Sequence, residues 1–395
     1  MKALVLYSFL PPDPVVSAEH MSGVSQFLSE SGYEVEGWSS IRNRRFSSTN
    51  RHKKNTKENN ITFYRVWIPN LNIDKKIGRI ISAFILLFTW IVRLCVFRKK
   101  FDLIVLGSDP LMGYAIVPVL RFFRVNTKIV YWCLDHYPGA FVSAGILSQS
   151  GIIFHAMMRF HNYCMKKMHT VFVIDENMKR YFFEHITSVP IVTLYPWGLS
   201  RSVSVKQTHL AEYRQEFGIN DGEILFLLTG NYGLAHHNDK YLELLKSLVK
   251  SERTHLLITV KGVNSRAVEC LATKNVTISA PVQLQKLELH LQAADVHVIS
   301  MDIRWQGVVF PSKITGALQA GRPILFLGPK DSSIGKMLEN HRVGWLVFDD
   351  LSLERAINLI SDCKILMRYR KNCKKLYLSE FDRLKAKKII QNAIK

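Results

Sequence analysis

Acidic residues are scarce in this sequence. Asp and Glu number 32 against 53 Lys and Arg, which leaves a formal net charge of +21 over 395 residues. The apolar fraction of 48% is high enough for buried cores, so the composition excludes a disordered protein. A chain of this length is expected to form two or three domains. The excess of basic residues calls for a partner or a site that explains it.

Paired cysteines and long apolar runs are also lacking. The six cysteines have no CxxC or His-rich spacing, so we predict neither a zinc site nor disulfides, and we expect reduced, cytosolic thiols. The most apolar segment, Ile77 to Phe97, is interrupted by Arg79 and Arg93. Only Ile80 to Val92 is free of charge, whereas a spanning helix needs about 20 apolar residues. The segment is therefore expected either to lie on a membrane or to form a core helix.

Short β-branched runs alternate with stretches of helical spacing along the chain, which predicts βαβ units and parallel sheets. The pattern restarts after Pro196, near a polar stretch at Gly198 to Gln207. We expect an α/β protein of two doubly wound, Rossmann-like domains, residues 1–200 and 201–377, facing across a cleft. The C-terminal helix, residues 378–395, is expected to cross back to the first domain. The expected strands are Ala3 to Tyr7, Leu103 to Gly107, Lys128 to Cys133, Thr170 to Ile174, Ile191 to Leu194, Ile224 to Thr229, His255 to Val260, Val276 to Ser279, Val296 to Ser300, Pro323 to Leu327 and Gly344 to Val347.

Two basic segments interrupt the alternation. Arg42 to Lys57 contains seven Lys and Arg residues and no acid among polar residues, which predicts a solvated loop. From Leu353 onward the chain is strongly basic and has helical spacing throughout. No repeat of 20 to 50 residues is visible, so the fold is not expected to be a solenoid.

The segment Gly307 to Gly321, GVVFPSKITGALQAG, predicts a helix from about Ser312 to Ala320. Pro311 suits its first turn, and the Ser312 side chain is expected to help cap the free amides. An exposed helix start beside Lys313 would suit a diphosphate, because free N–H groups, the helix dipole and an ammonium group all favour anions. An ordinary capped core helix fits the pattern equally well.

A glycine-rich turn follows a predicted strand in LFLLTGNYG and contains Gly230, Asn231 and Gly233. Glycines at the end of a strand allow the backbone to approach a phosphate or a sugar closely. The next strand, ITVKG, ends at Lys261 and brings another cation to the same sheet edge. Taken alone, Lys261 fits a surface lysine before a turn better than a ligand-binding residue.

The order TGNYG, VKG, AADVHVISM and FPSKITGALQAGRPILF resembles the nucleotide-sugar half of GT-B glycosyltransferases. The likeness is greatest to the retaining family 4 group, which builds bacterial surface polysaccharides. In the first half, LPPDPVVSAE is similar to the acceptor-side loop of such enzymes, and VTLYPWG to the hinge before the second domain. The resemblance extends over nearly the whole chain and is most specific at PSK and AGRP.

This resemblance implies a nucleotide-sugar substrate, no cofactor and no metal ion, and the chain has no DxD motif. The nucleobase would lie near Ala280 and Pro281. The reaction would be a front-face displacement in which the leaving diphosphate helps to deprotonate the acceptor. The residues implied to bind the donor diphosphate are Gly230, Asn231, Gly233, Lys261, Pro311, Ser312 and Lys313.

The chain departs from the family pattern at several positions. Both members of the usual Glu-x7-Glu pair are absent, since Val308 and Gly316 stand at those places. Asn231 replaces an arginine of the glycine turn, and Leu134 replaces a frequent active-site histidine. These changes weaken any inference about the donor sugar.

Asp135 and His136 follow a strand expected to end at the cleft, so they are predicted to orient or deprotonate the acceptor as catalytic residues. The alternative is a turn capped by Asp135 with a solvent-exposed His136. On the first loop, Ser17, Glu19 and His20 are candidate acceptor-side residues, or simply the polar start of a helix.

The basic excess fits an anionic membrane surface better than nucleic acid, because no zinc finger, RRM or helix-turn-helix signature is present. The cations that bracket the apolar segment are Lys75, Lys76, Arg79, Arg93, Arg98, Lys99 and Lys100. Together these features predict a retaining glycosyltransferase, cytoplasmic and peripheral at the inner face of the membrane. It would use a UDP or GDP sugar and a lipid-linked or polysaccharide acceptor. The alternatives are an inverting transferase, a nucleotide-sugar epimerase or a non-catalytic partner subunit.

Overall fold

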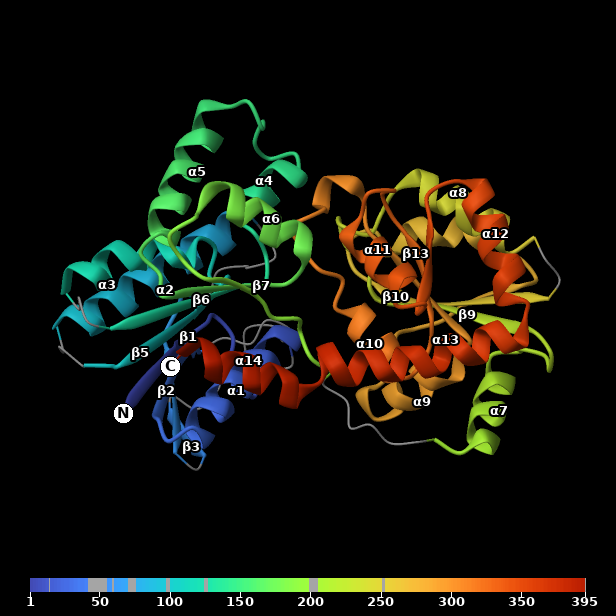
Figure 1. Ribbon diagram of the computed structural model, residues 1–395, viewed down its shortest axis with the longest axis horizontal. Coiled ribbons are helices and arrows are strands. Elements are labelled where there is room, and N and C mark those ends of the chain that lie inside the picture. The colour runs from blue at the N-terminus through green and yellow to red at the C-terminus, as the bar shows by residue number, and fades with distance from the viewer. Residues whose placement is uncertain are drawn as a thin grey trace. The chain divides into compact units, whose positions relative to one another are not determined.

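The computed structural model describes residues 1–13, 15–41, 55–58, 60–69, 76–96, 100–123, 127–198, 205–250 and 253–394. The chain divides into two compact units, Met1–Tyr195 with Ala386–Lys395, and Pro196–Lys385. Each unit is built on one largely parallel sheet (Figure 1), so the predicted α/β class with two parallel-sheet domains is confirmed. Part of the predicted boundary at Gly198 to Gln207 lies outside the described residues.

The first unit contains an eight-stranded sheet in the order β3-β4-β2-β1-β5-β6-β7-β8. Neighbouring strands run parallel except β3 and β4, which pair antiparallel at one edge. The antiparallel pair corrects two predictions, an all-parallel sheet and a loop throughout Arg42 to Lys57, of which residues 42–54 lie outside the described part. The strands are β1 (Lys2–Leu6), β2 (Glu34–Ser40), β3 (Asn55–Glu58), β4 (Ile61–Val66), β5 (Leu103–Gly107), β6 (Lys128–Cys133), β7 (Thr170–Val173) and β8 (Ile191–Thr193).

Helices cover both faces of the first sheet. Because crossovers between parallel strands are right-handed, α1 lies on one face, and α2, α3, α5 and α6 lie on the other. The last helix, α14, runs beside α1 (Figure 1), where Lys387 Nζ lies 2.7 Å from Glu30 Oε2. The helices are α1 (Val16–Glu30), α2 (Lys76–Val96), α3 (Val117–Phe123), α4 (Gly139–Ser143), α5 (Ile152–Met165), α6 (Glu176–His185) and α14 (Arg383–Ile394).

The apolar segment forms α2, a helix of 21 residues. Leu86, Trp90 and Leu94, which share one side of it, are 1% exposed and belong to the core of the unit. Its opposite side is exposed. By length and composition alone, Ile77–Cys95 could cross a membrane, with a mean hydropathy of 1.9, and 33% of it is buried.

The second unit contains a six-stranded parallel sheet in the order β11-β10-β9-β12-β13-β14. Successive side chains of its central strand enter different cores: Phe226 packs with the core that includes Leu244, and Leu227 with the core that includes Tyr213. This explains the continuous apolar runs of the sequence, since both faces of the sheet are covered. The strands are β9 (Ile224–Asn231), β10 (Thr254–Lys261), β11 (Val276–Ile278), β12 (Val296–Ser300), β13 (Ile324–Leu327) and β14 (Gly344–Val347).

Seven α-helices surround the second sheet in the described part of the unit, and from Leu353 to Ile394 the chain is almost wholly helical, as predicted. The helix α10, which begins at Lys313 of the PSK motif, is shorter than expected. The helices are α7 (Gln207–Glu216), α8 (Asp239–Leu248), α9 (Leu287–Ala293), α10 (Lys313–Gln319), α11 (Ser333–Asn340), α12 (Asp350–Ile360) and α13 (Cys363–Leu376).

Candidate functional site

The candidate donor site lies at the carboxyl edge of the second sheet, where its parallel strands end. Strand β9 pairs with β10 on one side and β12 on the other, so the strand order reverses at β9. The pairing with β12 covers only Val296 and His297, although β9 continues to Asn231. In open α/β sheets, ligands bind at such a switch point, beyond the carboxyl ends of the strands.

Two of the predicted diphosphate residues meet at this edge. Gly230 has a φ of +88°, and a Cβ atom placed on it would lie 3.3 Å from Cε of Lys313. The lysine stem therefore lies directly over the glycine backbone. A side chain at position 230 would strain the turn and push the lysine away. The resemblance implied that the end of β9 and the start of α10, far apart in the sequence, lie close together. They do so within this unit.

Three further predicted residues lie at the same edge. Asn231 pairs with Lys261 across β9 and β10, and the Tyr232 amide donates to the Lys261 carbonyl over 2.6 Å. Gly262 has a φ of +121°, and a Cβ on it would lie only 2.6 Å from Oδ1 of Asn231. A Cβ atom on Gly233 would lie 3.1 Å from Nδ2 of Asn231. The glycines thus leave room for the Asn231 side chain and keep the turn compact.

Lys313 is the most unusual charge at this edge. Its side chain forms no ion pair within the described residues, and burial lowers its pKa to about 8. An ammonium group removed from water without a carboxylate is unfavourable on its own. An anionic ligand would restore the missing interaction and raise the pKa again. The structure therefore places an unbalanced positive charge where a diphosphate was predicted.

His236 lies close enough to Lys313 for the lysine charge to act on it, although the sequence did not indicate a role for this histidine. Its Nδ1 lies 2.5 Å from the Ser300 carbonyl, and the Ser300 hydroxyl donates to the His236 carbonyl over 2.7 Å. Burial and the charge of Lys313 lower its pKa to about 3, so the ring is neutral. Because a carbonyl only accepts, Nδ1 carries the proton and Nε2 is left as an acceptor. The only sequence signal was its position shortly after the glycine turn.

The start of α10 differs from the prediction. Ser312 has helical backbone angles and its side chain caps no amide, whereas a capping serine would have extended angles. The amides of Ile314 and Thr315 donate to the carbonyls of Pro311 and Ser312 instead. The amides of Ile314 and Thr315 are therefore already bonded, and the charge at this helix start is the ammonium group of Lys313. Ser312 itself is exposed and Pro311 is buried.

The predicted nucleobase residues, Ala280 and Pro281, are exposed and follow β11. Strand β11 is the edge strand next to β10, so both residues lie beyond the same carboxyl edge as Lys261. This position is compatible with the prediction but does not test it.

In the first unit, Asp135 follows β6 and belongs to a charged cluster. The cluster also contains Arg79 from α2, Asp109 after β5, and Tyr137. Arg79 lies 3.6 Å from the Asp109 carboxylate and 3.5 Å from the Tyr137 hydroxyl. Burial opposes the charge of Arg79, but Tyr137, Asp109 and Asp135 together raise its pKa. The sequence signal was available, because Asp109 and Asp135 follow neighbouring strands.

His136, the other predicted catalytic residue, faces the protein interior. It is 3% exposed, and its ring contacts the rings of His161, Tyr181 and Phe182. Burial, and after it the nearby His161 and His185, hold the pKa of His136 well below the usual range. This corrects the alternative that His136 is solvent-exposed. Its catalytic role stays a prediction, which a buried neutral imidazole does not favour.

The acceptor-side candidates lie on a helix rather than on a loop. Helix α1 begins at Val16 and therefore contains Ser17, Glu19 and His20. Glu19 is exposed in its first turn, whereas His20 is 2% exposed and packs edge-on against Trp132. The family pattern predicts a loop over LPPDPVVSAE. In the structure, the non-helical part of this segment ends before Val16. Glu19 remains the accessible candidate of the three.

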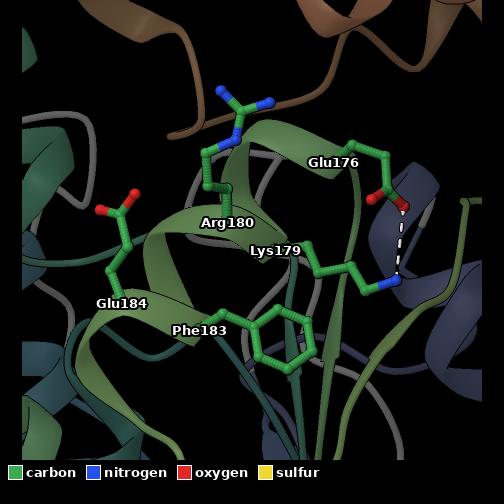
Figure 2. A pocket seen from close by; sticks show the side chains of 5 residues that line it. All are labelled: Glu176, Lys179, Arg180, Phe183 and Glu184. Atoms are coloured by element: carbon green, nitrogen blue, oxygen red, sulfur yellow. Dashed lines mark ion pairs between the residues drawn. The ribbon is translucent and has the colours of Figure 1, made fainter.

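A shallow pocket lies on α6, the helix whose Tyr181 and Phe182 contact His136. Figure 2 shows its lining, in which the side chains project in different directions from one helix. Lys179 pairs with Glu176 over 3.7 Å, so the pocket is not a site of unbalanced positive charge. In the described part of the chain, no group of three or more His, Cys, Asp or Glu side chains is placed to hold a metal ion. The pocket is lined by Glu176, Lys179, Arg180, Phe183 and Glu184.

Comparison with known proteins agrees with the fold. No family model matches the chain. A probable glycosyltransferase, WbjE of Pseudomonas aeruginosa, is 22% identical over 306 residues, which cover 74% of each chain. Among solved structures, the chain is similar to WaaG, a glycosyltransferase involved in lipopolysaccharide biosynthesis, with a TM-score of 0.65, 16% identity and 99% of both chains covered. It is also similar to HepE of Anabaena in complex with UDP, with a TM-score of 0.68, 11% identity, and 100% of this chain and 99% of that chain covered.

These likenesses show the GT-B fold, as the motifs predicted, and they support a glycosyltransferase. The assignment to family 4 stays a prediction. The retaining mechanism, the donor, the acceptor and the membrane partner are likewise predictions.

Proposed function

We propose that this chain of GT-B fold is a retaining glycosyltransferase that moves a sugar from UDP or GDP to a lipid-linked or polysaccharide acceptor. The observation that carries the proposal is the half-buried, unbalanced charge of Lys313 over the Gly230 turn. Its position at the switch point of the second sheet is where such folds bind ligands. The bound UDP of HepE and the lipopolysaccharide pathway of WaaG support the donor and acceptor classes.

The proposed reaction needs charge stabilisation more than acid or base chemistry. The bond between the anomeric carbon and the diphosphate oxygen breaks, and a bond to the acceptor oxygen forms on the same face of the sugar. The acceptor proton passes to the leaving diphosphate. Lys313 and Lys261 would hold that diphosphate and stabilise its growing negative charge in place of a metal ion. Turnover is accordingly expected to survive an excess of EDTA.

On the acceptor side, we propose that Asp135 orients the acceptor hydroxyl and that Arg79 positions the Asp135 loop. The contacts of Arg79 with Asp109 and Tyr137 support this role, because they join the loops after β5 and β6 through one guanidinium. Arg79 is a positioning residue in this scheme, since it acts through Asp135. A lipid-linked acceptor also requires the protein to work at the inner face of a membrane.

Calorimetric titration with UDP and GDP sugars tests the donor site. The wild-type chain should bind at least one of them, and Lys313→Ala should lose about 100-fold or more in affinity. Lys371→Ala, an exposed lysine of α13, is the matched control and should bind normally. If no nucleotide sugar bound the wild-type chain, a non-catalytic partner subunit would be the better assignment. Unchanged binding by Lys313→Ala would refute the site itself.

Analysis of the product anomer by NMR tests the mechanism. Retention of the donor configuration is expected, and inversion would identify an inverting transferase. Conversion of the nucleotide sugar in the absence of any acceptor would instead identify an epimerase.

A further inference from the structure

The outer side of α2 is an apolar stripe without a partner in the described part of its unit. Its exposed side chains recur at intervals of three or four residues, and the most exposed are 73% and 71% accessible, at Ile77 and Phe84. Surfaces of this kind on soluble domains mark binding sites, because water-exposed apolar patches are otherwise small. The stripe consists of Ile77, Ile80, Ile81, Phe84, Phe88 and Val92.

The two arginines that interrupt the apolar segment do not interrupt this stripe. Arg79 turns toward Asp109, and the Arg93 guanidinium lies 5.1 Å from the centre of the Trp38 ring. Their charges are thus used inside the unit. The sequence suggested a broken hydrophobic run, whereas the folded helix presents a continuous apolar face outward.

Neighbouring helices extend the surface. Helices α2 and α5 both pack against the short 3₁₀ helix Gly113–Ile116, on the same face of the sheet. The outer side of α5 begins with Ile152, which is 88% exposed, and continues through Arg159 and Tyr163. Between them, α3 ends in the exposed rings of Phe122 and Phe123.

The three helices that form this surface have no acidic side chains, whereas α6, farther along the same face, has Glu176 and Glu184. Helices α2, α3 and α5 contain no Asp or Glu, although they contain Lys76, Arg79, Arg93, Arg121 and Arg159, and Lys166 follows α5 directly. Arg159 and Lys166 are exposed along the outer side of α5. An acid-free surface of exposed apolar rings with cations beside them is complementary to the headgroups and outer acyl region of an anionic bilayer.

We infer that the outer sides of α2 and α5, with the end of α3, form a docking surface for an anionic lipid bilayer, in which α2 lies in the membrane plane. Helix α2 does not span the bilayer, because its other side is part of the protein core through Leu86, Trp90 and Leu94. The membrane that the proposed function requires would thus contact this one face of the first unit. The basic helix α14 lies on the opposite face of the same sheet and is not part of the surface.

The start of α2 lies at the carboxyl edge of the first sheet, since the helix runs from the end of β4 back to the start of β5. Arg79, one turn into α2, connects this end to the loops that contain Asp109 and Asp135. A docked bilayer would therefore lie beside the proposed acceptor residues. This position beside the acceptor residues rests on the proposed function, whereas the docking surface itself does not.

The test measures binding of the full chain to phosphatidylcholine vesicles with and without phosphatidylglycerol. Phe84→Glu/Phe88→Glu should weaken binding about 100-fold or more, since both rings leave the lipid and two negative charges are added. Leu351→Glu/Met367→Glu, a matched pair of exposed apolar residues on α12 and α13, should bind as the wild type does. Arg159→Gln/Lys166→Gln should weaken binding about fivefold per charge, only on vesicles with phosphatidylglycerol.

Unchanged vesicle binding by Phe84→Glu/Phe88→Glu, or no binding by the wild type, would overturn the inference. Resistance of the bound protein to alkaline carbonate extraction would show a spanning helix and also overturn it. A wild-type dimer that this double variant makes monomeric, without lipid binding by either, would identify a second copy as the occupant. Donor binding, measured on the same double variant, should stay at the wild-type value, which shows that the variant is folded. Vesicle binding without any nucleotide-sugar binding would leave the docking surface in place and refute the proposed function.

Discussion

Each sheet has a cation at its carboxyl edge, but only one of the two is balanced within its own unit. Arg79 in the first unit has Asp109, Asp135 and Tyr137 around it, and these groups raise its pKa. Lys313 in the second unit has no carboxylate partner in the described residues, and burial lowers its pKa to about 8. The first cation thus holds the protein's own loops together, whereas the second is left for a ligand. We therefore propose that Arg79 is a positioning charge and Lys313 a binding charge.

The largest effect is expected from removing the unbalanced charge. Lys313→Ala should reduce turnover about 100- to 1000-fold at saturating acceptor, because the leaving diphosphate loses its main cation. Protein stability should be unchanged or slightly increased, since a half-buried ammonium without a partner is removed. Steady-state kinetics measures the turnover, and thermal unfolding measures the stability. A large loss of stability would mean that Lys313 has a structural role like that of Arg79.

Removing the balanced charge should have a different signature. Arg79→Met should lower kcat about 100-fold by releasing the Asp135 loop, with donor affinity unchanged, and Arg79→Lys should restore part of the rate. Arg355→Met, an exposed arginine of α12, serves as the control. Equal losses of kcat and donor affinity would contradict a role restricted to the first unit.

Donor binding should depend on pH through the unbalanced Lys313. The pKa of Lys313 is about 8 in the free protein, below the 10.5 of an ordinary lysine, and a bound diphosphate should raise it. Below pH 8 the ammonium is already charged, so affinity should be nearly constant. Above pH 8, binding must take up a proton, and affinity should fall by up to about tenfold per pH unit. Calorimetry in buffers of different ionisation enthalpy measures this uptake, which should be absent in Lys313→Ala.

The smallest effect is expected at the glycine under the lysine. Gly230 and Gly222 both have a φ of +88°, but only Gly230 has Lys313 close to its would-be Cβ. Either change to alanine should cost about 1 kcal/mol of stability through backbone strain. Gly230→Ala alone should also weaken donor binding several-fold. Denaturant unfolding measures the stability of both variants, and calorimetry measures their donor affinity. Equal donor affinities of the two variants would show that the turn does not hold the lysine stem.

Much of the architecture could be predicted because its causes are local. Parallel strands buried on both faces are continuous β-branched runs, and four of the predicted strands, including Val296–Ser300, have the predicted bounds. The edge hairpin of β3 and β4 was missed because β3 is polar and lies beside a basic stretch, although β4 buries Ile61, Phe63 and Val66. The predicted serine cap of α10 was wrong because Ser312 has helical backbone angles, and the amides of Ile314 and Thr315 bond to backbone carbonyls instead.

The site could be predicted in part. The resemblance implies that Gly230 and Lys313 share one site, and in the structure a Cβ atom on Gly230 would lie 3.3 Å from Cε of Lys313. His236 was missed because its role depends on Ser300, 64 residues away. The burial of His136 and His20 could not be predicted either, since nothing in their neighbours along the chain shows which side of the strand or helix is covered.

The fold class, the glycine turns and the identity of the cations are readable from the amino-acid sequence, because they follow from side-chain patterns and backbone preferences. Which cations are balanced depends on the folded chain, since charges separated by many residues neutralise one another only when the fold brings them within a few ångströms. The same holds for α2. Its arginines appeared to divide an apolar run, and the fold turned both inward and left the outer side apolar.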